Sequence, residues 1–124
     1  MGETWSMLDD ERTLDGTEAA ALVSAHVDGG RLTTYFQSDR GRLLTVVSNG
    51  VRAMVVLMDG AGDAGEHAVS PGAAGSSDGY VLENGQVDTY EDSDTIPLAD
   101  AVAAVRSIID DGGPPSGASW SVDR

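Results

Sequence analysis

Two stretches of the chain repeat their apolar residues at the spacing of a helix. In residues 15–28 they recur every three or four positions, behind Asp15 and Glu18, which have the spacing of an N-terminal capping box. Residues 98–111 show a stronger stripe of the same kind, which begins after a proline and stops at Gly112. The pattern therefore predicts two amphipathic helices, each closed by glycine.

Between these helices the period of the pattern falls to two, as in β-strands. Residues 32–36, 43–47 and 51–58 are rich in Val, Leu and Thr and predict three strands of an antiparallel meander. The dipeptide Asn49-Gly50 is typical of a two-residue type I′ hairpin turn. Because residues 51–58 are apolar on both faces, we expect that strand to lie centrally in the sheet, with helices covering at least one side.

A second hairpin is predicted over residues 80–90, with its Asn-Gly turn at 84–85. Residues 59–79 before it hold six glycines and almost no large apolar side chains. They predict a long flexible loop, with room for a short strand at 67–70. Together these elements predict one domain over residues 1–124, of the α+β class: an antiparallel β-sheet meander with two packed α-helices.

The composition narrows the chemistry that the chain can perform. Its 124 residues carry 21 acidic side chains and seven basic ones, a formal charge of −14, which argues against binding to nucleic-acid phosphates or anionic membranes. There is no cysteine and no lysine, so disulfides, thiolate metal sites and lysine Schiff bases are excluded. Neither a secretory signal nor a membrane-spanning run is visible, and we expect a cytoplasmic protein without cofactor or metal.

Two familiar site patterns lack the context that they require. The Gly-x-Gly-x-x-Gly run at 60–65 follows a strand, but a proline interrupts the residues that would have to form the helix of a dinucleotide site. His26 and His67 are the only two imidazoles, and no Gly-x-Ser-x-Gly nucleophile motif accompanies them. The sequence still allows an enzyme that uses a pair of carboxylates as its catalytic acid and base.

The acidic side chains gather in one part of the chain. Ten carboxylates lie between Arg52 and Arg106, with no lysine or arginine among them. Such a surface should repel itself, and a basic partner would relieve that repulsion. We therefore predict a partner-binding surface here, with two tyrosines as anchors and five carboxylates as charge partners. The predicted contact residues are Tyr80, Glu83, Asp88, Tyr90, Glu91, Asp92 and Asp94.

The last third of the chain carries a longer pattern. A hydrophobic-Pro-x-x-x-Ala helix start at 96–101 leads to a Gly-x-x-Pro-x-x-hydrophobic-x-Trp run made by Gly112, Pro115 and Trp120. This pattern resembles the C-terminal signature of the first-numbered immunity-protein family of bacterial polymorphic toxin systems. The order of the upstream elements is similar too, whereas two isoleucines at 108–109 stand where members often have an aromatic pair.

The resemblance implies a non-enzymatic antitoxin that binds a cognate toxin inside the producing cell. The toxins of such systems are frequently nucleic-acid deaminases, whose positive substrate groove an acidic inhibitor could cover. Zinc and the catalytic Glu would belong to the toxin, and Trp120 would anchor the last strand of this chain in its core. Two alternatives remain: an acidic nucleic-acid mimic that regulates a host DNA-binding protein, and a small enzyme of unknown reaction.

Overall fold

Both predicted helices form, with the ends that the sequence indicates. α1 spans Gly16–Asp28 and α2 spans Leu98–Asp111. The capping box of α1 is complete: Asp15 Oδ1 accepts the Glu18 N–H at 2.8 Å, and Glu18 Oε1 accepts the Asp15 N–H at 3.1 Å. α2 ends at Gly112, which takes the left-handed conformation with φ of +83°.

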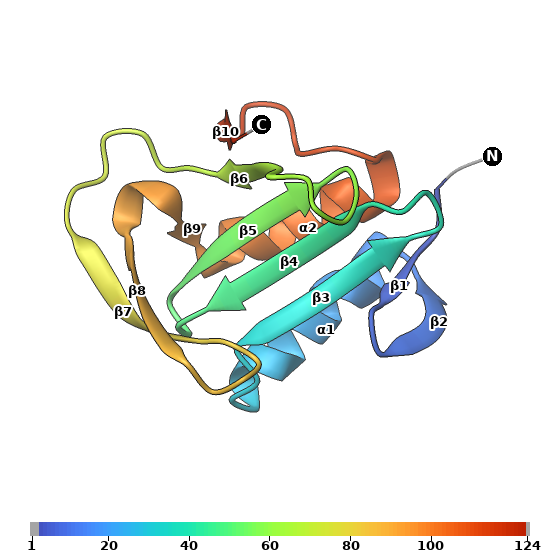
Figure 1. Ribbon diagram of the computed structural model, residues 1–124, viewed down its shortest axis with the longest axis horizontal. Coiled ribbons are helices and arrows are strands. Elements are labelled where there is room, and N and C mark those ends of the chain that lie inside the picture. Colours follow the sequence, from blue (N-terminus) through green and yellow to red (C-terminus); the bar gives the residue numbers. More distant parts are fainter. Residues whose placement is uncertain (1–2, 124) are drawn as a thin grey trace.

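The computed structural model describes residues 3–123, and in these residues the strands form one large antiparallel sheet and a separate hairpin (Figure 1). The large sheet has the order β10-β6-β5-β4-β3-β1-β2, with β9 also paired to β5, and the hairpin is β7–β8. A short 3-10 helix, η1, precedes β9. The bounds are β1 Trp5–Met7, β2 Asp10–Leu14, β3 Thr33–Ser38, β4 Leu43–Ser48, β5 Arg52–Met58, β6 Glu66–Ala68, β7 Ser76–Val81, β8 Val87–Glu91, η1 Asp92–Asp94, β9 Ile96–Pro97 and β10 Trp120–Val122.

Both helices pack on the same face of the large sheet, behind it in the view of Figure 1. Alternate side chains of the three meander strands point into this interface and are buried, led by Phe36, Leu44 and Val55, which meet Val23 of α1 and Val105 of α2. β5 lies between β4 and β6, so its predicted central place is confirmed, as is the α+β class. In the part of the chain that the structure describes, no helix has the length and apolar run needed to cross a membrane.

An N-terminal hairpin, β1–β2, extends the sheet beyond β3 and was not predicted. β1 is only three residues long, so its two buried side chains, Trp5 and Met7, are too few to establish a period. β2 is exposed and charged over most of its length, with only Leu14 buried. β1 is defined by its pairing with β3, and β2 by its pairing with β1, which the local pattern does not reveal.

Residues 59–79, expected to be one flexible loop, are divided by strand pairing. β6 lies within this segment and pairs on one side with β5 and on the other with β10. The segment is tied down again further along, where the Ser70 N–H donates to the Ser93 carbonyl at 2.9 Å and the Asp92 N–H donates to the Gly75 carbonyl at 3.0 Å. The short strand expected at 67–70 is thus present at 66–68, and one of its two partners, β10, is distant in sequence.

The two Asn-Gly turns differ from the predicted type. A type I′ turn needs positive φ at both central residues, and among the described residues only glycines have positive φ. In the β4–β5 turn, Asn49 Oδ1 instead accepts the N–H groups of Val51 at 3.0 Å and Arg52 at 2.7 Å. Gly50 alone is left-handed there, and Gly85 alone in the β7–β8 turn. The asparagine side chain therefore supports the first turn as an Asx turn.

Candidate functional site

The predicted acidic hairpin forms and lies against one end of the large sheet. Thr33 Oγ1 at the start of β3 donates to the Val81 carbonyl at 2.7 Å. Asn49, just after β4, donates through Nδ2 to the Asp78 carbonyl at 3.1 Å. The hairpin is therefore fixed where β3 begins and β4 ends, at the left of Figure 1.

Tyr80 and Tyr90 have different environments although their rings are adjacent, with centroids 4.7 Å apart. Tyr80 is 0% exposed, and its hydroxyl has no hydrogen-bond partner in the described part of the chain. Tyr90 is half-buried and donates its hydroxyl to Asp88 Oδ2 at 3.0 Å; burial, helped by this carboxylate, raises the pKa of Tyr90 to about 12. The prediction of Tyr80 as a partner contact is therefore corrected: its side chain packs the hairpin, and only Tyr90 has surface to offer.

Three of the five predicted carboxylates lie on the hairpin itself. Glu83 and Glu91 are exposed, and Asp88 is half-buried. Asp88 accepts hydrogen bonds from Gln86 Nε2 at 2.7 Å and from the Tyr90 hydroxyl. We call Glu83, Asp88 and Glu91 the hairpin carboxylates.

Asp92 is instead part of the fold, because Arg52 reaches it from β5. Asp92 Oδ1 accepts the Ser77 hydroxyl at 2.6 Å and lies 3.8 Å from Arg52 Nε. Arg52 also donates to Thr95 Oγ1 at 2.9 Å and to the Thr95 carbonyl at 2.9 Å. Its remaining hydrogen bonds reach the Asp92 carbonyl at 3.0 Å and Ser70 Oγ at 3.1 Å. The acidic stretch therefore does contain a cation in the folded protein, because the side chain of Arg52 reaches it from β5.

Asp94 is connected to the edge of the sheet by His67. The imidazole Nε2 lies 3.1 Å from Asp94 Oδ1, and Nδ1 lies 2.7 Å from Asp123 Oδ2. His67 belongs to β6, and Asp123 directly follows β10. Burial lowers the pKa of His67, but the hydrogen bonds to Asp123 and Asp94 together outweigh burial and leave the pKa above its ordinary value of 6.5.

This cluster makes stability depend on pH in a defined direction. Because the pKa of His67 is higher in the folded state, its contribution to stability is complete below pH 6.5 and disappears as pH rises through the raised value. We expect the free energy of unfolding to fall between about pH 6 and 8, as measured by urea denaturation. His67→Gln should flatten this dependence. His26, whose pKa is lowered mainly by burial, titrates in both proteins, so the difference between them reports His67. Equal slopes for the two proteins would contradict the assignment.

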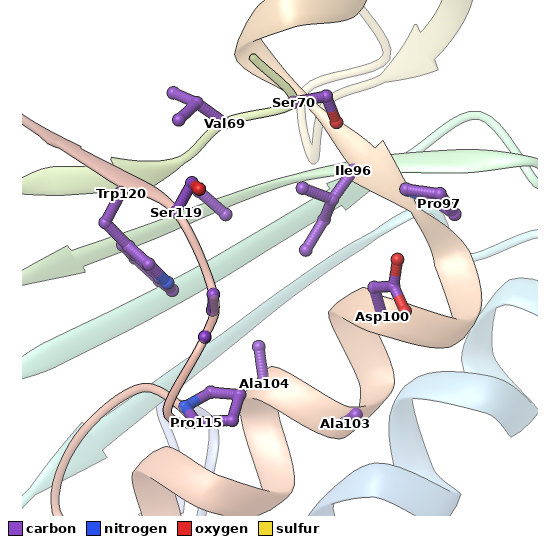
Figure 2. A pocket seen from close by; sticks show the side chains of 13 residues that line it. Val69, Ser70, Ile96, Pro97, Asp100, Ala103, Ala104, Pro115, Ser119 and Trp120 are labelled. Atoms are coloured by element: carbon purple, nitrogen blue, oxygen red, sulfur yellow. The ribbon is translucent and has the colours of Figure 1, made fainter.

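A cavity of about 380 Å³ lies between α2 and the segment at 115–120 (Figure 2). Small side chains dominate its wall, and of the described residues that line it only Asp100 is titratable. The cavity therefore does not supply the second carboxylate that an acid–base pair would need. Trp120 lines it from β10, half-buried and packed against the core, with an indole N–H that has no hydrogen-bond partner in residues 3–123. The ring of Trp120 thus packs against the core, as expected for a residue that anchors the last strand.

No family model, curated protein or solved structure matches this chain. The resemblance to the immunity-protein family therefore rests on the signature at residues 96–120 and on the order of the upstream elements. Among residues 3–123, no group of three or more histidine, aspartate or glutamate side chains is placed to hold a metal ion.

The structure separates the predicted contact residues into two groups. Glu83, Asp88, Tyr90 and Glu91 belong to the hairpin, whereas Asp92 and Asp94, which follow it, are in contact with Arg52 and His67. Neither of these basic residues was predicted to take part. Their contacts join positions 27 to 56 residues apart, so no local pattern in the sequence could have indicated them.

Proposed function

We propose that this protein is an immunity protein that binds and inhibits a cognate nucleic-acid-acting toxin inside the producing cell. The observation that carries the proposal is the hairpin, which displays Glu83, Asp88 and Glu91 on a chain with a formal charge of −14. The immunity-type signature at residues 96–120 supports the same conclusion. A cytosine deaminase is the toxin class that this resemblance favours.

The charge of the hairpin suits such a partner. An enzyme that acts on DNA or RNA needs a positive groove to hold phosphates. Carboxylates placed over that groove can pair with its arginines and speed the encounter. Inhibition would then follow from covering the entrance to the active site, and the catalytic zinc of a deaminase would remain in the toxin.

The test is protection and binding against the toxin domain encoded by the neighbouring gene. The variant Glu83→Gln, Asp88→Asn, Glu91→Gln keeps side-chain size and removes three charges. We expect it to weaken binding about tenfold or more, because each rim ion pair contributes up to about 1 kcal/mol. Calorimetry would give the affinity, and survival of cells that express the toxin would give protection.

A matched variant tests whether the position of the removed charges matters, rather than their number alone. Asp28→Asn, Asp100→Asn, Asp111→Asn also removes three charges, from exposed positions on or next to the two helices. Its binding should stay within about twofold of wild type at physiological salt.

Association of the wild-type protein with the toxin domain should slow steeply between about 0.02 and 0.5 M salt. Equal losses in both variants, or rates independent of salt, would remove the hairpin from the interface.

A further inference from the structure

The face of the large sheet that points away from the helices has an apolar centre. On β3, β4 and β5 the residues between the buried ones point to this face, and they are half-buried. Register places them in adjacent rows: Tyr35 beside Thr45, Thr45 beside Val56, and Leu43 beside Met58. Both helices lie behind the sheet (Figure 1). We call this surface the open face; its central residues are Tyr35, Leu43, Thr45, Met54, Val56 and Met58, with Gln37 beside Leu43 and with Arg52 at the end of β5 that contacts Thr95.

The hairpin closes one end of the open face. Thr33 and Val47, which belong to the same outward rows, are 4% and 6% exposed, and Thr33 donates its hydroxyl to β7. Tyr90 belongs to the same hairpin, and its ring centroid lies 4.7 Å from that of the buried Tyr80. The hairpin therefore borders the apolar centre of the open face at one end.

Two carboxylates lie at the margin of the open face next to β6. His67 lies opposite Val56 in register and so shares the open face, and it holds Asp94 and Asp123, whose side chains are 48% and 39% exposed. Asp59, directly after β5, is 70% exposed but lies 4.0 Å from Arg42 Nε, which is on the helix side over the Trp5 ring. Arg40, exposed in the β3–β4 turn, is a cation at the same end. Exposed carboxylates therefore border the open face next to β6, on a chain with a formal charge of −14.

We propose that the open face is the main docking surface, and that its occupant is a protein with an apolar or aromatic centre and an arginine- and lysine-rich margin. This inference rests on the proposed function and locates its interface. A second copy of the chain is a poor occupant, because two acidic margins on molecules of charge −14 would repel each other. A groove for single-stranded nucleic acid has the required composition, since it combines base-stacking aromatic side chains with phosphate-binding cations. The inhibitor would then occupy the place of the substrate strand.

Methionine oxidation tests the docking surface in the unmodified protein. Met54 and Met58 lie on the open face, whereas Met7 is 7% exposed in the core and serves as an internal reference. The probe is the toxin domain of the neighbouring gene, added at saturation before dilute hydrogen peroxide. We expect oxidation of Met54 and Met58 to slow several-fold in the complex, and the slow oxidation of Met7 to remain unchanged.

A pair of substitutions gives an independent readout. Thr45→Arg places a cation in the middle of the open face, and Ala99→Arg places one at an exposed position on α2, on the helix side. With both melting temperatures near that of wild type, Thr45→Arg should weaken binding about tenfold or more, and Ala99→Arg less than about twofold. Thr45→Val should bind like wild type, which excludes loss of the hydroxyl as the cause.

The outcomes separate this inference from the proposed function. If the wild-type protein binds the toxin domain but oxidation of Met54 and Met58 is unchanged and Thr45→Arg binds normally, the open face is not the interface and the immunity function stands. If the wild-type protein does not bind the toxin domain, both proposals fall. A single-stranded oligonucleotide that competes with the inhibitor for the toxin would support occupation of the substrate groove.

Discussion

Arg52→Met should lower the free energy of unfolding by about 3 kcal/mol, measured by urea denaturation. Methionine keeps the apolar stem of the side chain and removes the guanidinium. Four hydrogen bonds are lost, to Thr95, Ser70 and Asp92, and the carboxylate of Asp92 loses its nearby cation. The side chain of Arg52 is 20% exposed, so water compensates part of the loss, and we expect the lower end of the range for a broken buried ion pair.

The matched control is Arg12→Met, at an exposed position in β2. The same atoms are removed there without a side-chain contact in the described residues, so stability should change by less than about 0.5 kcal/mol. A loss below 1 kcal/mol for Arg52→Met would show that water replaces the guanidinium, and that Arg52 does not hold η1 against β5.

Gly16→Ala should destabilise the protein by about 3 kcal/mol, although alanine normally favours a helix over glycine. Gly16 is the first residue of α1 and is buried against the end of α2. Its N–H donates to Asp110 Oδ1 at 2.7 Å. A Cβ at this position would lie 2.5 Å from the backbone carbonyl oxygen of Arg106 and 2.5 Å from Asp110 Oδ2. The two helices would have to move apart, because the backbone cannot give way locally.

Two further variants make this result interpretable. Gly113→Ala, where an added Cβ meets nothing within 4 Å, should leave stability nearly unchanged. Adding Asp110→Ala to Gly16→Ala should restore little, because the Arg106 carbonyl still blocks the Cβ. If Gly16→Ala were as stable as wild type, the close approach of α1 to α2 at this point would be wrong.

The elements that could be predicted from the sequence carry their own local signals. α1 has its capping box, α2 its apolar stripe and C-terminal glycine, and the meander its alternating residues joined by short turns. β1, β6, β9 and β10 have two or three residues each and exist because of the strands beside them. Their pairing is a property of the whole sheet, which explains why they were missed or only partly indicated.

The same distinction between local signals and long-range contacts applies to the candidate site. The sequence places carboxylates on a hairpin, which the structure confirms, but it does not say which side of the hairpin faces the sheet. The pairing is irregular between Ser77 and Tyr80, and Tyr80 is turned inward. Arg52 and His67 were not identified because each acts on residues far along the chain. Long-range contacts therefore decide which acidic residues are available to a partner.

The connection of β6 to β10 also bears on the order in which the chain can fold. His67 and Asp123 are 56 residues apart, whereas β3, β4 and β5 are joined by short turns. Contacts of long sequence separation form late, since the intervening chain must first be ordered. During synthesis the outer edge of β6 remains unpaired until residues 120–122 have left the ribosome. An unfinished sheet edge is a template for association with other chains, and the strong negative charge would keep such nascent molecules apart.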